Sequence, residues 1–179
     1  MLRGINVGRN KRIRMNELRE LYLSLNFKDV KTYIQSGNVI FKYLDSDPSD
    51  LEDKIQNKLL ELFEFDVKVI IRTMNELKKV IAENPFNEVD TKHLYVTFLS
   101  DSPSEKLVNE IKFNKEAMAK NESDKYFISL SEVYLFLPGG YGITKLNNNF
   151  FEKKLNLSCT TRNWKTINKL FDIAMSISE

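Results

Sequence analysis

The 179-residue sequence contains few of the residues on which covalent cross-links and metal sites depend. It has one cysteine, Cys159, which excludes an intrachain disulfide and fits a cytoplasmic location. It has one histidine, His93, whereas a site built from His and Cys usually takes three or four such ligands. We therefore expect no metal site and no cofactor.

Long hydrophobic runs are also missing from the sequence. No apolar stretch reaches the roughly 20 residues needed to cross a bilayer, and the N-terminus lacks the apolar segment of a signal peptide. With 42% hydrophobic and 29% charged residues, the composition is that of a globular chain large enough to bury a core. We expect no membrane partner.

Charge is distributed unevenly although the net charge is only +2. Residues 1–44 hold nine Lys and Arg against three Asp and Glu, a balance of +6. Residues 45–124 hold eleven against eighteen (−7), and residues 125–179 hold seven against four (+3). If the two basic ends meet in the fold, one face would attract anions. Solvated surfaces without a ligand would give the same pattern.

Hydrophobic spacing in the first half predicts the order β-α-β-β-α-β followed by a closing helix, which is the ferredoxin-like arrangement. Asn16, Asp47 and the Thr73/Glu76 pair are expected to cap its three helices. Because a buried strand normally runs about five residues, the first strand, which ends at Asn6, is expected to be truncated. The predicted elements are a strand at Leu2–Asn6, a helix at 15–25, strands at Lys31–Gln35 and Asn38–Tyr43, a helix at 48–63, a strand at Asp66–Arg72 and a helix at 75–83.

The second half repeats the same order with little residue identity between the halves. We therefore predict an α+β fold of two ferredoxin-like units, at residues 1–86 and 87–179. A single larger α+β sheet built from the same elements is the alternative. The predicted elements are a strand at Leu94–Leu99, a helix after Pro103, strands at Tyr126–Leu130 and Val133–Leu137, a helix at Phe150–Leu155, a strand at Ser158–Thr161 and a helix from Trp164.

The loop after the first strand, Arg3-Gly4-Ile5-Asn6-Val7-Gly8, combines glycines with a basic run. Five cations occur within the first fourteen residues, and no acid appears before Glu17. A loop that feeds a helix N-terminus can bind an anion through backbone N–H groups. The string matches neither the phosphate-loop nor the dinucleotide pattern, and a surface loop with glycine turns explains it equally well.

Three other polar segments could contact a ligand. Gln35-Ser36-Gly37-Asn38 offers amide and hydroxyl groups, although a tight hairpin turn also explains these residue types. The glycine-rich loop 138–142 leads to Lys145, a candidate anion contact. Arg162 lies in Thr160-Thr161-Arg162-Asn163-Trp164, and its planar guanidinium suits a carboxylate or phosphate, or an internal salt bridge.

The sequence has no catalytic signature. Cys159 lacks a neighbouring cation and histidine, and His93 has no visible Ser or Asp partner. The leading hypothesis is a binding protein for a small anionic, phosphate-bearing ligand. Its expected contacts are Arg3, Asn6, Lys11, Gln35, Asn38, Lys145 and Arg162.

Two alternatives remain open. Ferredoxin-like sheets can stack single-stranded RNA on aromatic residues, and Tyr33, Phe41 and Tyr43 lie on predicted strands. These aromatics are more easily explained as core or sheet-face residues. An enzyme acting on a small phosphorylated metabolite, with Lys or Arg as electrostatic catalysts, is the other alternative.

Several motifs together resemble the bacterial family known as domain of unknown function 1697. They are LRGINVG at 2–8, MNELRELYLSLNF at 15–27, VKTYIQSGNVIF at 30–41, NPF at 84–86, TKL at 144–146 and TTRNW at 160–164. Arg9 stands where relatives tend to have glycine, and Thr144 where serine is common. Relatives also begin several residues earlier, which agrees with a truncated first strand. The resemblance supports the fold and implies no established activity.

Overall fold

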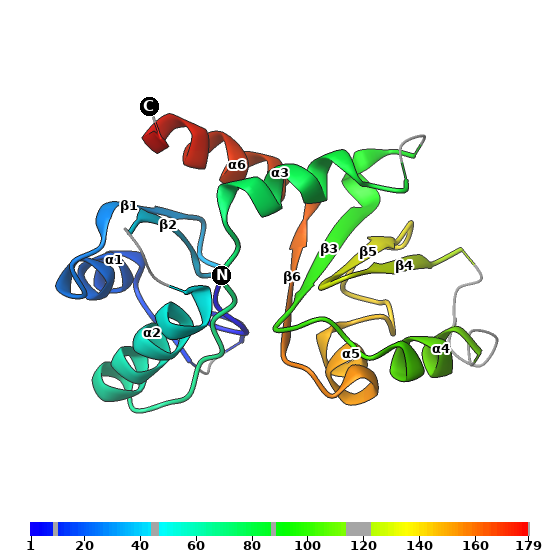
Figure 1. Ribbon diagram of the computed structural model, residues 1–179, viewed down its shortest axis with the longest axis horizontal. Helices are drawn as coiled ribbons and strands as arrows, with labels where there is room; N and C mark the ends of the chain where they lie inside the picture. Colours follow the sequence, from blue (N-terminus) through cyan, green and yellow to red (C-terminus); the bar gives the residue numbers. More distant parts are fainter. Residues whose placement is uncertain (9–10, 44–46, 87–88, 114–122, 179) are drawn as a thin grey trace. The chain divides into compact units, whose positions relative to one another are not determined.

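The structure is a computed structural model that describes residues 1–8, 11–43, 47–86, 89–113 and 123–178 (Figure 1). It is an α+β protein whose described strands form two separate antiparallel sheets rather than one larger sheet. The chain divides into two compact units. Unit 1 comprises Met1–Lys78 and Lys169–Glu179, and unit 2 comprises Lys79–Asn168.

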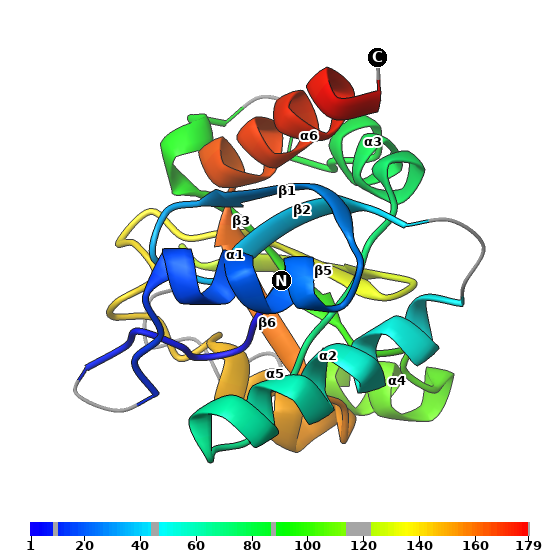
Figure 2. The same cartoon turned by 90° about the vertical axis from the view of Figure 1, so that its left-hand side faces the viewer.

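Unit 1 is built around a two-stranded hairpin, β1–β2. Its register pairs Tyr33 with Asn38 and Lys28 with Lys42, with an irregularity between Lys28 and Lys31. Helices α1 and α2 lie together on one side of the hairpin, as Figure 2 shows. The elements of the first half are α1 (Met15–Ser24), β1 (Lys28–Tyr33), β2 (Asn38–Lys42), α2 (Pro48–Phe63) and α3 (Met74–Ala82).

Aromatic side chains fill much of the unit 1 core. Phe27 stacks on Phe41 with ring centroids 4.4 Å apart, and Tyr22 meets both rings edge-on. Complete burial raises the pKa of Tyr22 far above its usual range, because the phenolate would lose its water. Such packed aromatic pairs add stability beyond the area that they bury.

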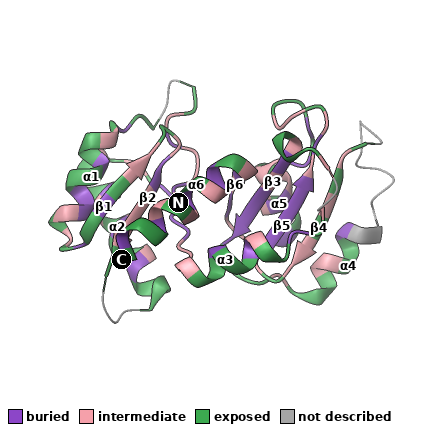
Figure 3. Ribbon diagram, turned by 90° about the horizontal axis from the view of Figure 1, so that it is seen from above, coloured by how far each residue is buried: buried purple, intermediate pink, exposed green. Residues whose placement is uncertain are grey.

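Unit 2 contains a four-stranded sheet with the order β4-β5-β3-β6. The connectivity β3-α4-β4-β5-α5-β6 is the order predicted for the second half. Figure 3 shows the buried residues of this unit concentrated in β3 and β5, its two central strands. The elements are β3 (Leu94–Leu99), after the short 3-10 turn η1 (Thr91–His93), α4 (Glu105–Phe113), β4 (Lys125–Ser129), β5 (Glu132–Phe136), α5 (Asn148–Leu155), β6 (Cys159–Asn163) and α6 (Trp164–Ser178).

Helix starts follow the predicted capping chemistry in two of three cases. Asp47 accepts from the backbone N–H of Ser49 at 2.8 Å, and Thr73 and Glu76 form the predicted reciprocal capping box. The prediction that Asn16 caps α1 is wrong, because that helix begins at Met15.

The strand predicted at Asp66–Arg72 is reduced to a single bridge, Leu2↔Val69. The segment still pairs with the start of the chain: Arg3 N donates to Lys68 O at 2.8 Å, and Ile70 N donates to Met1 O at 2.9 Å. The β-branched run therefore contributes an extended, paired segment without a regular strand.

The observed division of the chain differs from the predicted one at residues 86 and 87. Residues 79–86 group with unit 2, and residues 169–179 group with unit 1. The division falls inside α3 and α6, whose ends belong to different units. The helix predicted to close the first unit therefore spans the boundary between the units.

Glu52 gives unit 1 a predicted pH dependence. Partial burial raises the pKa of this carboxyl above its ordinary 4.5, although it accepts from the Ile71 N–H and lies near Arg72. The folded chain therefore holds this proton more tightly than the unfolded chain. Stability should fall as pH rises from about 4.5 through the raised folded value. Glu52→Gln keeps an acceptor for the Ile71 N–H and cannot ionise. The variant should therefore lack the part of the stability decrease that is due to Glu52.

The melting temperatures of the wild type and Glu52→Gln, measured between pH 4 and 7, test this prediction. The two should agree at the acidic end, with the variant the more stable at neutral pH. Parallel curves over the whole range would contradict it.

Candidate functional site

The side chain of Asn6 connects the first loop to the hairpin turn of unit 1. Its Oδ1 accepts from Ile13 N at 2.9 Å, and its Nδ2 donates to Ile13 O at 2.9 Å and to Gln35 O at 2.8 Å. The backbone N–H of Asn6 also donates to Lys11 O at 3.0 Å, which closes the loop. Two polar segments singled out in the sequence, 3–8 and 35–38, therefore adjoin each other.

Gly37 makes the second connection between these segments. Its carbonyl accepts from Leu2 N at 2.9 Å, and its φ of +75° is in the left-handed region. A Cβ at this position would lie 2.8 Å from both Ile5 Cδ1 and Leu2 Cβ. Only glycine fits here without displacing the start of the chain. We call residues 3–8, 11–14 and 34–37 the basic loop face.

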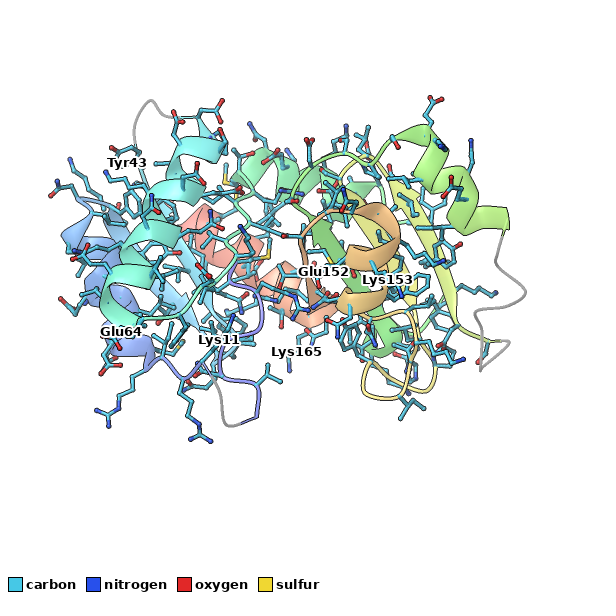
Figure 4. All side chains as sticks on the ribbon, turned by 90° about the horizontal axis from the view of Figure 1, so that it is seen from below. Lys11, Tyr43, Glu64, Glu152, Lys153 and Lys165 are labelled. Carbon is cyan, nitrogen blue, oxygen red and sulfur yellow. The ribbon has the colours of Figure 1, made fainter. Side chains whose placement is uncertain are left out.

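Three described cations of the basic loop face are exposed: Lys11, Arg12 and Arg14. Lys11 Nζ donates to Asp66 O, and Arg12 Nη2 donates to Gly8 O at 3.4 Å. No described carboxylate lies within ion-pair distance of any of the three. Figure 4 labels Lys11 on this loop. The cations thus lack an internal counter-charge among the described side chains. Arg9 and Asn10, part of the same basic run, lie outside the described residues.

The N-terminus of α1 is already occupied by an internal carboxylate. Glu17 Oε2 accepts from Arg14 N at 3.2 Å. An external anion would compete with this group for the backbone donors of the first turn. The loop and its side chains, rather than the helix terminus, are therefore the groups available to an anion.

The hairpin turn itself contains a strained residue. Ile34 has a φ of +50° and is 48% exposed. A β-branched residue in this conformation is a rare outlier, and such strain persists only where the surroundings enforce it. Here the Asn6 and Gly37 contacts fix both sides of the turn.

The other predicted contacts in unit 1 differ in exposure. Gln35 is exposed, and its backbone carbonyl is the acceptor for Asn6. Arg3 is half-buried. Asn38 is 0% exposed, and its Nδ2 donates to Tyr33 O at 3.1 Å and to Ser36 Oγ at 2.9 Å. The contacts of Asn38 shape the turn, whereas Gln35 faces solvent.

Lys145 and Arg162 lie in unit 2. Lys145 is exposed, whereas Arg162 is only 7% exposed. Arg162 Nη1 donates to Thr160 Oγ1 and to Thr161 O, both at 2.8 Å. Burial lowers the pKa of Arg162 to about 10, so the side chain stays charged at neutral pH. The participation of these two residues in one site with those of unit 1 stays a prediction.

Sequence reasoning missed a polar network in unit 2. Thr161 Oγ1 lies 2.7 Å from Thr97 Oγ1, accepts from Tyr141 OH at 3.2 Å and donates to Asn148 Oδ1 at 2.6 Å. Cys159 Sγ adds a longer contact to the Asn148 carbonyl at 3.5 Å. The network ties β3, β6 and α5 to the glycine-rich loop.

Sequence reasoning also missed a cavity of about 250 Å³ within unit 1. Its lining includes apolar side chains of β2 and of the C-terminal part of α6, and Lys42 and Arg72 contribute cations. Among the described residues, no three His, Cys, Asp or Glu side chains are placed to hold a metal ion. None of the described helices is long and apolar enough to span a bilayer.

These features define an α+β protein with a basic loop face on one unit and a closed polar network in the other. A family model described as "Protein of unknown function (DUF1697)" matches residues 1–134, and the chain belongs to this family. The predicted family membership is thereby confirmed.

A solved structure shares the fold. It is the conserved bacterial protein SP0830 from Streptococcus pneumoniae, which matches with a TM-score of 0.68 and 22% identity over 97% of this chain and 96% of that chain. No curated protein matches the sequence.

Proposed function

We propose that this protein is a cytoplasmic binding protein for an anionic, phosphate-bearing ligand, and that the basic loop face supplies the binding groups. The observation that carries the proposal is the Asn6 connection, which holds two polar segments 29 residues apart in sequence against each other. The scarcity of cysteine supports the proposed cytoplasmic location.

The electrostatics of the basic loop face favour an anion. Lys11, Arg12 and Arg14 share one short loop without a described counter-charge. Together they make the electrostatic potential at this loop more positive, which attracts an anion. Guanidinium groups can bind phosphate oxygens through two parallel hydrogen bonds. An anion would also reduce the mutual repulsion of the three cations. Exposed charges at such a site are screened by salt, so affinity should depend on ionic strength.

Inorganic pyrophosphate is a suitable probe, because it carries the phosphate chemistry without any other recognisable group. At about 100 times its Kd it should stabilise the full chain by about 2.7 kcal/mol, a rise in melting temperature of roughly 5 to 10 °C. Arg12→Ala and Lys11→Ala should each lower this gain by more than half. Lys78→Ala, which removes an exposed lysine of α3, is the matched control and should leave it unchanged.

Two results of this titration would refute the proposed site. One is the absence of any shift with pyrophosphate at low salt, and the other is an equal shift in the wild type, Arg12→Ala and Lys78→Ala. The same titration on Arg3→Ala and Arg162→Ala examines two of the remaining predicted contacts. Loss of the gain in both would assign Arg3 and Arg162 to the same ligand, together with the exposed cations.

We further propose that both units follow the ferredoxin-like plan. In unit 2, the order β6-β3-β5-β4 with helices after the first and third strands supports it. In unit 1, residue 2 bonds to residue 37 on one side and bridges residue 69 on the other, which supports the same strand order. Hydrogen-bond couplings measured by NMR that failed to pair residues 1–3 with residues 68–70, or residue 2 with residue 37, would contradict this for unit 1.

A further inference from the structure

The end of the hairpin remote from the basic loop face contains a second feature, a cavity of about 540 Å³ in unit 1. Its size falls in the range typical of sites for small organic ligands. We call it the aromatic notch. Its lining residues are Asn26, Lys28, Phe41, Lys42 and Tyr43.

The wall of the aromatic notch contains packed aromatic rings. Phe41 is stacked on Phe27 at 4.4 Å, and Tyr43 meets Phe27 at 5.0 Å with the planes 78° apart. Lys54 Nζ lies 5.3 Å from the Tyr43 centroid and 5.7 Å from that of Phe27. These contacts hold the Tyr43 ring in place although it is 39% exposed. A fixed, exposed ring is a stacking surface for a planar ligand.

Two lysines of the notch lie opposite each other across the hairpin. The register pairs Lys28 directly with Lys42, an arrangement in which like charges repel. Lys42 Nζ is 3.1 Å from Asp29 Oδ2, whereas no described carboxylate forms an ion pair with Lys28. An anion placed between the two ammonium groups would offset their repulsion.

Asn26 adds a side chain that can form hydrogen bonds with the edge of a heteroaromatic ring. Its backbone has a φ of +63°, and its side chain is exposed. Within the described part of the chain, its carboxamide makes no hydrogen bond. The carboxamide offers a donor and an acceptor together, the combination that pairs with the edge of an adenine ring.

We propose that the aromatic notch binds a purine nucleoside monophosphate. The base stacks on the Tyr43 and Phe41 wall, Asn26 pairs with its edge, and Lys28 and Lys42 hold the phosphate. The site is separate from the basic loop face, because five residues of β1 at about 3.3 Å each put roughly 17 Å between the two ends of the hairpin. Figure 4 labels Tyr43 and Lys11 at well-separated places in unit 1. This proposal does not depend on the proposed function.

Isothermal titration of the full chain with AMP tests this site, with adenosine and ribose 5-phosphate as partial ligands. AMP should bind more tightly than either part, because each part lacks one half of the contacts. Tyr43→Leu should weaken AMP binding at least about fivefold, the lower end of the effect of losing one stacking contact. Lys28→Gln should weaken it about threefold and reduce its salt dependence, whereas Lys78→Gln should leave it unchanged.

Several outcomes would overturn the proposal. They are no binding of AMP, equal binding of AMP and ribose 5-phosphate, and wild-type affinity in both Tyr43→Leu and Lys28→Gln. Binding of single-stranded oligonucleotides without binding of AMP would also overturn it, in favour of a nucleic-acid surface. Circular dichroism checks the fold of Tyr43→Leu, and the exposed Lys28 provides a variant that leaves the core untouched. Arg12→Ala separates the two sites, since it should lower the pyrophosphate response by more than half and keep AMP binding.

Discussion

Gly37→Ala should destabilise the protein by about 3 kcal/mol, because two unfavourable terms coincide at this residue. The φ of +75° costs an L-residue about 1 to 2 kcal/mol. The new methyl group would also lie 2.8 Å from Leu2 Cβ, an atom too close to the backbone to move aside cheaply. Such overpacking costs about 1 to 3 kcal/mol. The free energy of unfolding from urea denaturation measures the sum.

Gly8→Ala is the matched control for Gly37→Ala. Gly8 has a similar φ of +66°, but a Cβ there would meet no atom of the described residues within 4 Å. Gly8→Ala should therefore lower the free energy of unfolding only by the conformational cost of about 1 to 2 kcal/mol. The difference between the two variants isolates the contact of Gly37 with the start of the chain. Equal decreases in the free energy of unfolding of the two variants would mean that this contact contributes nothing to stability.

Asn6→Ala should destabilise the protein by about 2 to 3 kcal/mol, because it removes three hydrogen bonds and leaves their partners unsatisfied. Ile13 is 2% exposed, so its N–H and carbonyl have little access to water as a substitute. The link from the first loop to Gln35 is lost at the same time. The variant should therefore also weaken the pyrophosphate response, although Asn6 carries no charge.

Two further substitutions separate the contributions of Asn6. Asn6→Gly accepts the φ of +56° without cost and loses only the side-chain bonds. Asn6→Asp keeps the acceptor for Ile13 N and loses both donated bonds. Urea denaturation should rank the four chains as wild type, Asp, Gly and Ala in decreasing stability. A free energy of unfolding for Asn6→Ala within about 0.5 kcal/mol of the wild type would refute the role of this side chain.

Local chemistry made much of the fold predictable. Residues 94–99 form the predicted strand at the predicted bounds, because β-branched and aromatic residues fit a central strand. The Thr73/Glu76 capping box needs only residues three apart. The capping residue of α1 was mispredicted because Asn16 is the better capping residue by type. The decisive signal was Glu17, whose carboxylate reaches back to Arg14 N across the same three-residue spacing.

The candidate site was less predictable, because its geometry depends on contacts between distant residues. Asn6 and Gln35 were singled out as polar groups in turns, but their mutual hydrogen bond joins positions that no local pattern relates. Asn38 was expected to face a ligand, and its complete burial follows from its place opposite Tyr33 in the hairpin. The aromatic notch arises from the register of Lys28 and Lys42, which the sequence does not display.

The central claim is that a phosphate-bearing anion binds the basic loop face. Its most direct test is a pyrophosphate titration of the full, isotopically labelled chain followed by amide chemical shifts in NMR spectra. The account predicts saturable shifts that are largest at residues 3–8, 11–14 and 34–37 and that shrink together in Arg12→Ala. Saturable shifts confined to other residues, or no saturation at low salt, would contradict it.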